Sequence, residues 1–174
     1  MNQKIAVIGA GSWGTTLANH LAKKGYRVNL WVYEKEICRT IEEKRENPIF
    51  LPNVRLHDHI KPFNDLKASV QDINAIISAP PSHVVRQIWE KLASEIPKAT
   101  RVISVSKGIE TKSLLTMSQA IEEVVGNGAN LHLCVLSGPT FAREVSAELP
   151  TAAVAASKDP DIAIWAQKLV SNSN

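Results

Sequence analysis

The stretch KIAVIGAGSWGTTLANHLAKKGYRVNLWVYEKE, residues 4–36, decides how this chain folds. It begins with a short apolar run, continues through the turn GAGSWG into an amphipathic segment, and ends in a second apolar run. Trp13, Leu17 and Leu21 recur at a spacing of four, so they share one face of a helix that is expected to end at Gly25. The stretch therefore predicts a strand, a glycine-rich turn, a helix and a second strand.

The rest of the chain continues this alternation of short apolar runs and amphipathic segments. Strands are expected at 5–8, 28–32, 75–78, 102–105, 131–136 and 152–156, and helices at 82–96, 111–125 and 159–170. The strands are rich in Val and Ile on both faces, which is typical of a parallel sheet covered by helices. This order predicts an α/β fold with a Rossmann-type, doubly wound, mainly parallel sheet. The proline-containing stretch 47–62 is expected to form a long surface excursion.

Composition narrows the class of protein. The 174 residues are 44% hydrophobic and 21% charged, with a net charge of +3 and only 5% aromatic residues. Basic residues are scattered among acidic ones, so no nucleic-acid partner is expected. Cys38 and Cys134 lie far apart and outside any metal-binding motif, which favours free thiols in a reducing compartment. No leader sequence or membrane-spanning run is expected, and a cytoplasmic location is predicted.

The glycine-rich turn has the context that a dinucleotide-binding site requires. Gly9 permits a tight turn, Gly11 lets a pyrophosphate approach the backbone, and Gly14 lets the helix pack closely on the strand. The helix begins near Ser12 and Trp13, where free N–H groups and the positive end of the helix dipole favour an anion. A purely structural glycine turn is the alternative, which the strand–turn–helix context disfavours.

The choice between NAD and NADP stays open. Glu34 lies at the distance from the glycines at which an acidic residue binds the ribose hydroxyls of NAD. Lys35 and Arg39 follow it and offer positive charge to a 2′-phosphate, although such charges on a helix are usually only solvated.

Loops after three later strands carry further candidate residues. The loop APPS, at 79–82, is expected either to form a rigid wall beside a ligand or to be a plain turn. Lys107 follows the next strand and offers an ammonium group to an anion or a carbonyl oxygen. In the loop SGPT, Gly138 makes a turn and Thr140 is expected to cap the next helix. Because ligands bind beyond the carboxyl ends of the strands in such folds, these loops are expected to converge.

Together these motifs resemble one enzyme family. GAGSWGTTLA, VNLWVYE, LPN, SAPPSHVV, SKGIE and SGPTFAREV occur in order across residues 4–156. This set resembles bacterial NAD(P)-dependent glycerol-3-phosphate dehydrogenase. The resemblance implies hydride transfer between a nicotinamide cofactor and dihydroxyacetone phosphate or sn-glycerol 3-phosphate, in the synthesis of glycerophospholipid precursors.

The resemblance also implies roles for matched positions. Cofactor contacts are expected at Ser12, Trp13, Tyr33, Lys107 and Ala142, and substrate contacts at Lys107, Gly138 and Thr140. Tyr33 would lie near the adenosine ribose, where many relatives carry a basic residue, and this departure weakens any preference for NADP.

The family's second, helical domain is expected to be absent from this chain. Residues 1–174 are then a single dinucleotide-binding domain, without the lysine that the family uses as its acid/base, so no catalytic residue is assigned within them. The chain is expected to be inactive alone, and a homodimer is one expected assembly. The alternative hypothesis is a free-standing NAD(P)-binding redox sensor or interaction module.

Overall fold

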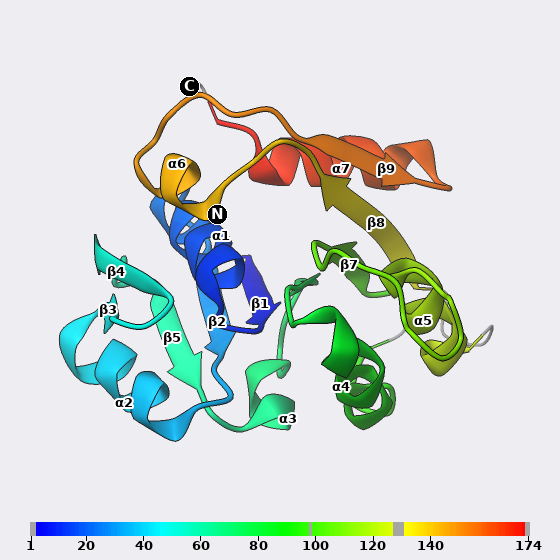
Figure 1. Ribbon diagram of the computed structural model, residues 1–174, viewed down its shortest axis with the longest axis horizontal. Coiled ribbons are helices and arrows are strands. Elements are labelled where there is room, and N and C mark those ends of the chain that lie inside the picture. Colours follow the sequence, from blue (N-terminus) through cyan, green and yellow to red (C-terminus); the bar gives the residue numbers. More distant parts are fainter. Residues whose placement is uncertain (1–2, 98, 127–130, 173–174) are drawn as a thin grey trace.

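The computed structural model describes residues 3–97, 99–126 and 131–172. These residues form a seven-stranded sheet with the strand order β5-β2-β1-β6-β7-β8-β9 (Figure 1). Its strands are β1 Lys4–Ile8, β2 Arg27–Trp31, β5 Ile60–Phe63, β6 Ala75–Ser78, β7 Arg101–Ser104, β8 His132–Ser137 and β9 Val154–Ser157. Neighbouring strands are parallel except β8 and β9, which are antiparallel. The predicted Rossmann-type, doubly wound sheet is confirmed.

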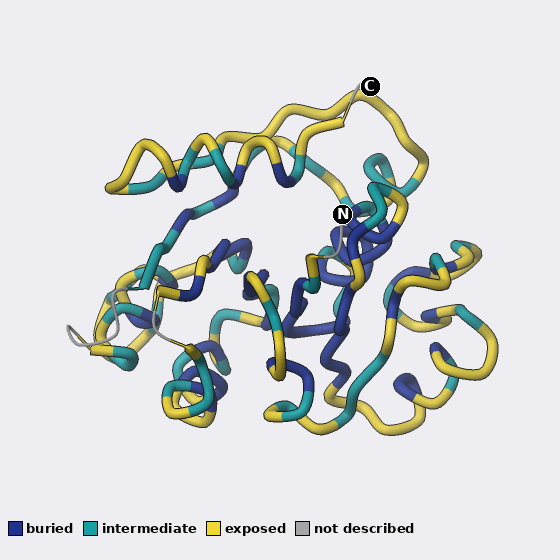
Figure 2. Tube along the Cα trace, turned by 180° about the vertical axis from the view of Figure 1, so that it is seen from behind, coloured by how far each residue is buried: buried dark blue, intermediate teal, exposed yellow. Residues whose placement is uncertain are grey.

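Helices cover both faces of the sheet. They are α1 Ser12–Lys23, α2 Lys35–Lys44, α3 Leu66–Ser69, α4 Val85–Leu92, α5 Met117–Val125, α6 Ala142–Ser146 and α7 Pro160–Val170. In β1, Ile5 and Val7 join the core that contains α1, α2 and α7, whereas Ala6 and Ile8 join the core that contains α4 and α5. The central strands are therefore buried on both faces, as the dark segments of Figure 2 show.

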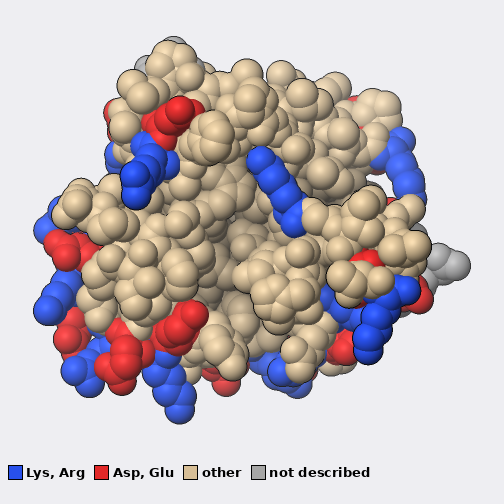
Figure 3. Space-filling model, viewed as in Figure 1, with Lys and Arg blue, Asp and Glu red and all other residues tan. Residues whose placement is uncertain are grey.

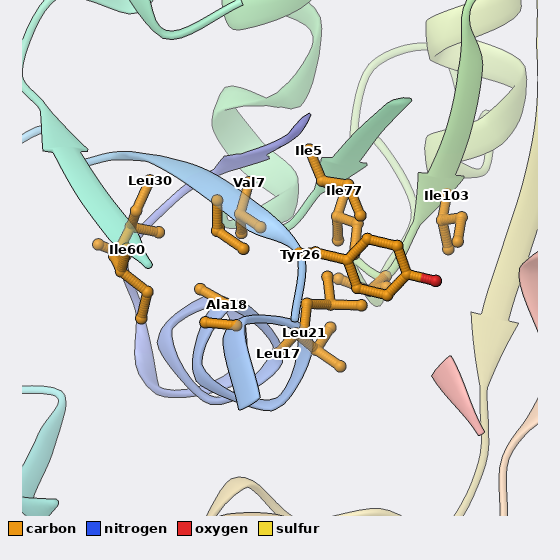
Figure 4. Close-up of a cluster of buried hydrophobic side chains, with 14 of the residues drawn as sticks. Ile5, Val7, Leu17, Ala18, Leu21, Tyr26, Leu30, Ile60, Ile77 and Ile103 are labelled. Carbon is orange, nitrogen blue, oxygen red and sulfur yellow. The ribbon is translucent and has the colours of Figure 1, made fainter. Parts of the chain in front are cut away.

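Helix α1 lies against the sheet through the face that the sequence predicted. Leu17, Ala18 and Leu21 are buried in the same core cluster as Val7 and Leu30, and Figure 4 shows this part of the core. The helix begins directly after the turn that follows β1, so its position on the sheet also fixes the position of its first turn.

Gly14 permits the closest contact between this helix and the sheet. A Cβ atom at Gly14 would lie 2.0 Å from the backbone oxygen of Gly9, a distance that Cβ atoms do not tolerate. A Cβ atom at Gly11, by contrast, would meet nothing within 4 Å. The two glycines therefore serve different purposes: Gly14 allows the helix to pack, and Gly11 leaves open space in front of the helix.

The stretch 47–62 is more ordered than the expected surface excursion. It contributes to the small antiparallel pair of β3 Glu46–Asn47 and β4 Leu51–Arg55, and to β5. Strand β5 pairs with β2 in parallel and forms one edge of the main sheet. Pro62 obscured this strand in the sequence, because proline is depleted from strands but is tolerated at a sheet edge.

Two helices begin later than their sequences suggested. The predicted helix 82–96 is a 3₁₀ turn at Ser82–Val84 followed by the shorter α4. The predicted helix 111–125 begins only at α5, because Thr116 and Gln119 form a reciprocal capping box that fixes its start. The terminal helix expected at 159–170 is confirmed as α7.

Two basic side chains hold helix α7 against α1: His20 lies within α1, and Lys24 is the C-cap residue of α1. The Nε2–H group of His20 donates to the carbonyl oxygen of Val170 over 2.7 Å. The ammonium group of Lys24 donates to the carbonyl oxygens of Leu169, Lys168 and Ser171, which lie at the C-terminal end of α7. Burial lowers the pKa of His20, and Lys24 and Lys23 lower it further, against the opposing effects of the Val170 bond and Glu148.

The two glycines predict different effects of adding one methyl group. Gly14→Ala should lower the free energy of unfolding by about 3 kcal/mol, because the helix must move off the Gly9 backbone. Gly11→Ala should cost less than about 1 kcal/mol, since only a helix-capping position changes. Urea unfolding followed by circular dichroism measures both, and equal losses would contradict this account of the packing.

His20 predicts a loss of stability in mild acid. Because its pKa is lowered in the folded chain, the unfolded chain binds the proton more readily as the pH falls below the ordinary value of 6.5. The stability associated with neutral His20 is therefore present above this value and is lost as the pH falls. His20→Gln keeps a donor for Val170 and should lose less stability between about pH 7 and about pH 5. Urea unfolding of both proteins at the two pH values measures this loss. An equal loss of stability in the wild-type chain and in His20→Gln would refute the assignment of the pH dependence to His20.

Candidate functional site

A cleft of about 370 Å³ opens at the carboxyl ends of the central strands. It lies where the chain order reverses, between β1 and β6, because β2 and β5 continue on one side of β1 while β7 and β8 continue on the other. Its lining residues are Gly11, Ser12, Trp13, Gly14, Ala79, Pro80, Pro81, Ser82, Val105, Ser106, Lys107, Thr140, Phe141 and Ala142. Four segments far apart in the sequence thus converge, as the strand-end argument predicted.

The first turn of α1 forms one wall of this cleft. Gly11 is the N-cap residue and provides no side-chain cap, and the first turn carries no acidic residue. The N–H groups at the start of a helix have no partner within the helix, so they are free to bind an anion in the cleft. Gly11 also leaves the space in front of them open. This wall therefore fits the phosphate groups of a dinucleotide.

A buried asparagine holds the glycine-rich turn in place. The side-chain amide of Asn47 donates to the carbonyl oxygen of Ala10 and to the hydroxyl of Thr15, each over 2.9 Å. Its side-chain oxygen accepts from the backbone N–H of Phe50, while the hydroxyl of Ser12 donates to the Phe50 carbonyl oxygen. The β3–β4 segment is therefore fastened to the turn. Asn47 was missed in the sequence, where it stands among prolines in a stretch without a regular period.

Lys107 lines the side of the cleft opposite α1. It follows β7, and its ammonium group lies 3.5 Å from the carbonyl oxygen of Gly138, which follows β8. The side chain is exposed, so the ammonium group keeps donors for a ligand. Lys107 and the α1 N-terminus both line the cleft and both favour negative charge.

The other predicted residues lie at this edge of the sheet with different relations to the cleft. Thr140 and Ala142 line it. Gly138 lies outside the lining, and its carbonyl oxygen contacts the ammonium group of Lys107. The expected cap by Thr140 is wrong: Phe141 is the N-cap residue of the short α6 and makes no side-chain cap. Tyr33 follows β2, is 76% exposed and packs edge-on against Trp31, outside the cleft lining.

A second cavity of about 470 Å³ lies beside the cleft, between α1, α6 and α7. Trp13 and Thr140 line both spaces and so stand at their boundary. On the face seen in Figure 3, the centre of the molecule is hollowed and mostly uncharged, while acidic and basic side chains gather toward the periphery.

The described part of the chain contains neither a metal-binding cluster nor a membrane-spanning helix. Among residues 3–97, 99–126 and 131–172, no group of three or more His, Cys, Asp or Glu side chains is arranged to hold a metal ion. No helix within those ranges is both long and apolar enough to span a membrane.

Cys38 and Cys134 are both buried and free, and burial raises the pKa of each thiol.

Comparison with known proteins shows which family this chain resembles. Residues 4–163 match the family model for the N-terminus of NAD-dependent glycerol-3-phosphate dehydrogenase. A glycerol-3-phosphate dehydrogenase (NAD(P)+) of Geobacter metallireducens is 44% identical over 169 residues, which are 97% of this chain and 50% of that protein. The corresponding protein of Citrifermentans bemidjiense is 43% identical over 163 residues, which are 94% of this chain and 49% of that protein.

The fold has a close counterpart among solved structures. The crystal structure of glycerol-3-phosphate dehydrogenase from Coxiella burnetii superposes with a TM-score of 0.91 at 32% identity, covering 99% of this chain and 52% of that one. The chain thus spans about half the length of these relatives. Since the family model covers nearly all of the chain, the chain belongs to the family of the N-terminal domain of NAD-dependent glycerol-3-phosphate dehydrogenase.

Proposed function

We propose that this chain is the cofactor-binding half of a glycerol-3-phosphate dehydrogenase and that the cleft between β1 and β6 holds NAD or NADP. The observation that carries the proposal is the pairing of an uncapped helix N-terminus with Lys107 across one cleft at the reversal of strand order. The family model, which spans residues 4–163, supports this choice of ligand.

The proposal gives each part of the cleft a role. The backbone of Gly9, Gly11 and Gly14, with Ser12 and Trp13, holds the pyrophosphate at the start of α1. Tyr33 lies at the carboxyl end of β2, adjacent to β1, where its ring is available to the adenosine ribose.

On the opposite side of the cleft, Ala142 contacts the cofactor, and Gly138 and Thr140 contact the substrate. Lys107 contacts both ligands, because it spans from the β7 loop to the β8 loop.

The chemistry follows from these positions. When bound, the nicotinamide supplies or accepts the hydride that interconverts dihydroxyacetone phosphate and sn-glycerol 3-phosphate. The ammonium group of Lys107 attracts the anionic substrate and stabilises negative charge on its reacting oxygen. The proton for that oxygen is assigned to a second, helical domain, in the half of the relatives that this chain does not match.

The wider proposal concerns the complete enzyme. Residues 1–174 act as one dinucleotide-binding domain, and the complete enzyme works as a homodimer in the cytoplasm, where it supplies sn-glycerol 3-phosphate for glycerophospholipid synthesis. Residues 1–174 alone do not suffice for turnover.

Calorimetric titration with NADH and NADPH tests the binding half of the proposal. At least one nucleotide should bind, and Lys107→Met should weaken that binding about tenfold through loss of a charged contact. Gly11→Ala should weaken it while leaving the unfolding midpoint nearly unchanged. Lys158→Met is the matched control, because Lys158 is 86% exposed and pairs with Glu122 away from the cleft. Failure of both nucleotides to bind the wild-type chain would refute the proposal.

A turnover assay tests the catalytic half. NADH oxidation by the chain in the presence of dihydroxyacetone phosphate should not exceed the rate in buffer, because the proton donor is assigned elsewhere. Absorbance at the NADH band measures this directly. Turnover by the chain would show that the acid/base lies among residues 1–174 and would contradict that assignment.

A further inference from the structure

We propose that Arg86 and Glu110 position Lys107 in the cleft, although neither residue lines it. This inference rests on the proposed function, since it concerns how the lysine is presented to the cofactor and substrate. Segment 105–110, which carries Lys107, is held along segment 78–86 by hydrogen bonds, a close backbone contact and an ion pair.

The first fastening points lie at the ends of β6 and β7. The backbone N–H of Val105 donates to the carbonyl oxygen of Ser78 over 2.9 Å. The hydroxyl of Ser106 donates to the carbonyl oxygen of Pro80 over 2.6 Å. These bonds fix the backbone immediately before Lys107.

The next point is the close contact at Gly108. A Cβ atom there would lie 2.9 Å from both Cβ and Oγ of Ser82, and the backbone has a φ of +132°, which favours glycine. The turn after Lys107 is thereby pressed against the start of the 3₁₀ turn that leads into α4. Any change in the path of residues 108–110 alters this contact.

The last point is the ion pair between Arg86 and Glu110. Nε of Arg86 lies 2.8 Å from Oε1 of Glu110, and a terminal nitrogen lies 2.8 Å from Oε2, which is a bidentate arrangement. The two side chains are 30% and 18% exposed, so water screens the pair less than a surface pair. Arg86 also bonds Glu123 of α5 over 2.8 Å, which ties the pair to a second helix.

Glu110 is fastened by its backbone as well as by its carboxylate. Its N–H donates to the carbonyl oxygen of Leu115, and its carbonyl oxygen accepts from Leu114, each over 2.9 Å. Ile109 and Thr116 form an isolated bridge that closes this loop before α5. Hydrogen bonds from Arg86 and from Ser113 lower the pKa of Glu110 to about 2, so the carboxylate is ionised near neutral pH.

The side chain of Lys107 points away from the contacts that hold its neighbours along segment 78–86. Its neighbours Ser106 and Gly108 contact segment 78–86, whereas its ammonium group extends to the carbonyl oxygen of Gly138. A long lysine side chain has many rotamers, so a fixed backbone on both sides reduces the number of positions that its ammonium group can adopt. Arg86 and Glu110 therefore act through Lys107 and not by contact with a ligand.

A double-mutant cycle on NADH binding tests the inference. Glu110→Gln is nearly isosteric and removes the charge, so the chain should fold while NADH binding weakens about fivefold. In a Lys107→Met background, Glu110→Gln should change the affinity by less than about twofold, because the group it positions is gone. Calorimetry of the four proteins gives the coupling. Equal effects of Glu110→Gln in both backgrounds would overturn the inference, since a general structural role predicts additivity.

A matched control and a second readout separate this result from the proposed function. Glu122→Gln removes an exposed ion pair of α5 with Lys158 and should leave NADH affinity unchanged. The NMR signal of ¹³C-methylated Lys107, assigned through Lys107→Arg, should move in Glu110→Gln toward the position of a solvated lysine side chain that averages over its rotamers. An unchanged signal would overturn the inference even in a chain that binds no NADH, whereas absence of binding by the wild-type chain would by itself refute only the proposed function.

Discussion

The close approach of α1 to the turn after β1 is the constraint on which the rest of the site depends. It brings the Gly14 position so near to the Gly9 carbonyl that a single methyl group would not fit. That approach, together with the buried face at Leu17 and Leu21, sets the axis of the helix relative to the sheet. The axis in turn aims the unpaired N–H groups of the first turn at the cleft between β1 and β6. An anion site made of backbone groups has no side chain to adjust, so its accuracy comes from the packing of α1 and from the hydrogen bonds by which Asn47 holds the turn.

The side of the cleft opposite α1 is built on a different principle. Its positive charge is on a flexible side chain, Lys107, and packing of apolar groups cannot fix an exposed ammonium group. Contacts along the flanking backbone provide the order instead: Gly108 against Ser82 and the carboxylate of Glu110 against Arg86. The cleft thus joins a rigid wall set by helix packing and a second wall set by polar contacts.

Much of this arrangement could be predicted from the sequence, because it depends on short-range patterns. The glycine-rich turn, the spacing of Leu17 and Leu21, and the run of strands rich in Val and Ile each report local geometry. Placement of Lys107 at the cleft followed from one general property of parallel sheets, that their strand ends share an edge.

The rest depended on contacts between distant residues. Asn47 is buried only because its hairpin folds back onto Ala10 and Thr15, and nothing in the order of residues near it indicates this. The Arg86–Glu110 pair joins two charged residues that each resemble solvated surface residues in the sequence. Strand β5 was obscured by Pro62, and the start of α6 by Thr140, a residue type that often caps helices although the N-cap residue here is Phe141.

Pro62 also makes the two edges of the sheet unequal. The carbonyl oxygens of His59 and Phe63 accept hydrogen bonds from β2 and the residue after it, so the backbone of Pro62, which has the opposite parity, faces outward. An approaching strand would find no N–H donor there, and proline at an edge is a recognised barrier to strand addition. Strand β9, at the other edge, carries no proline. Pro62 therefore protects the β5 edge against strand addition, whereas β9 has no such protection from a proline.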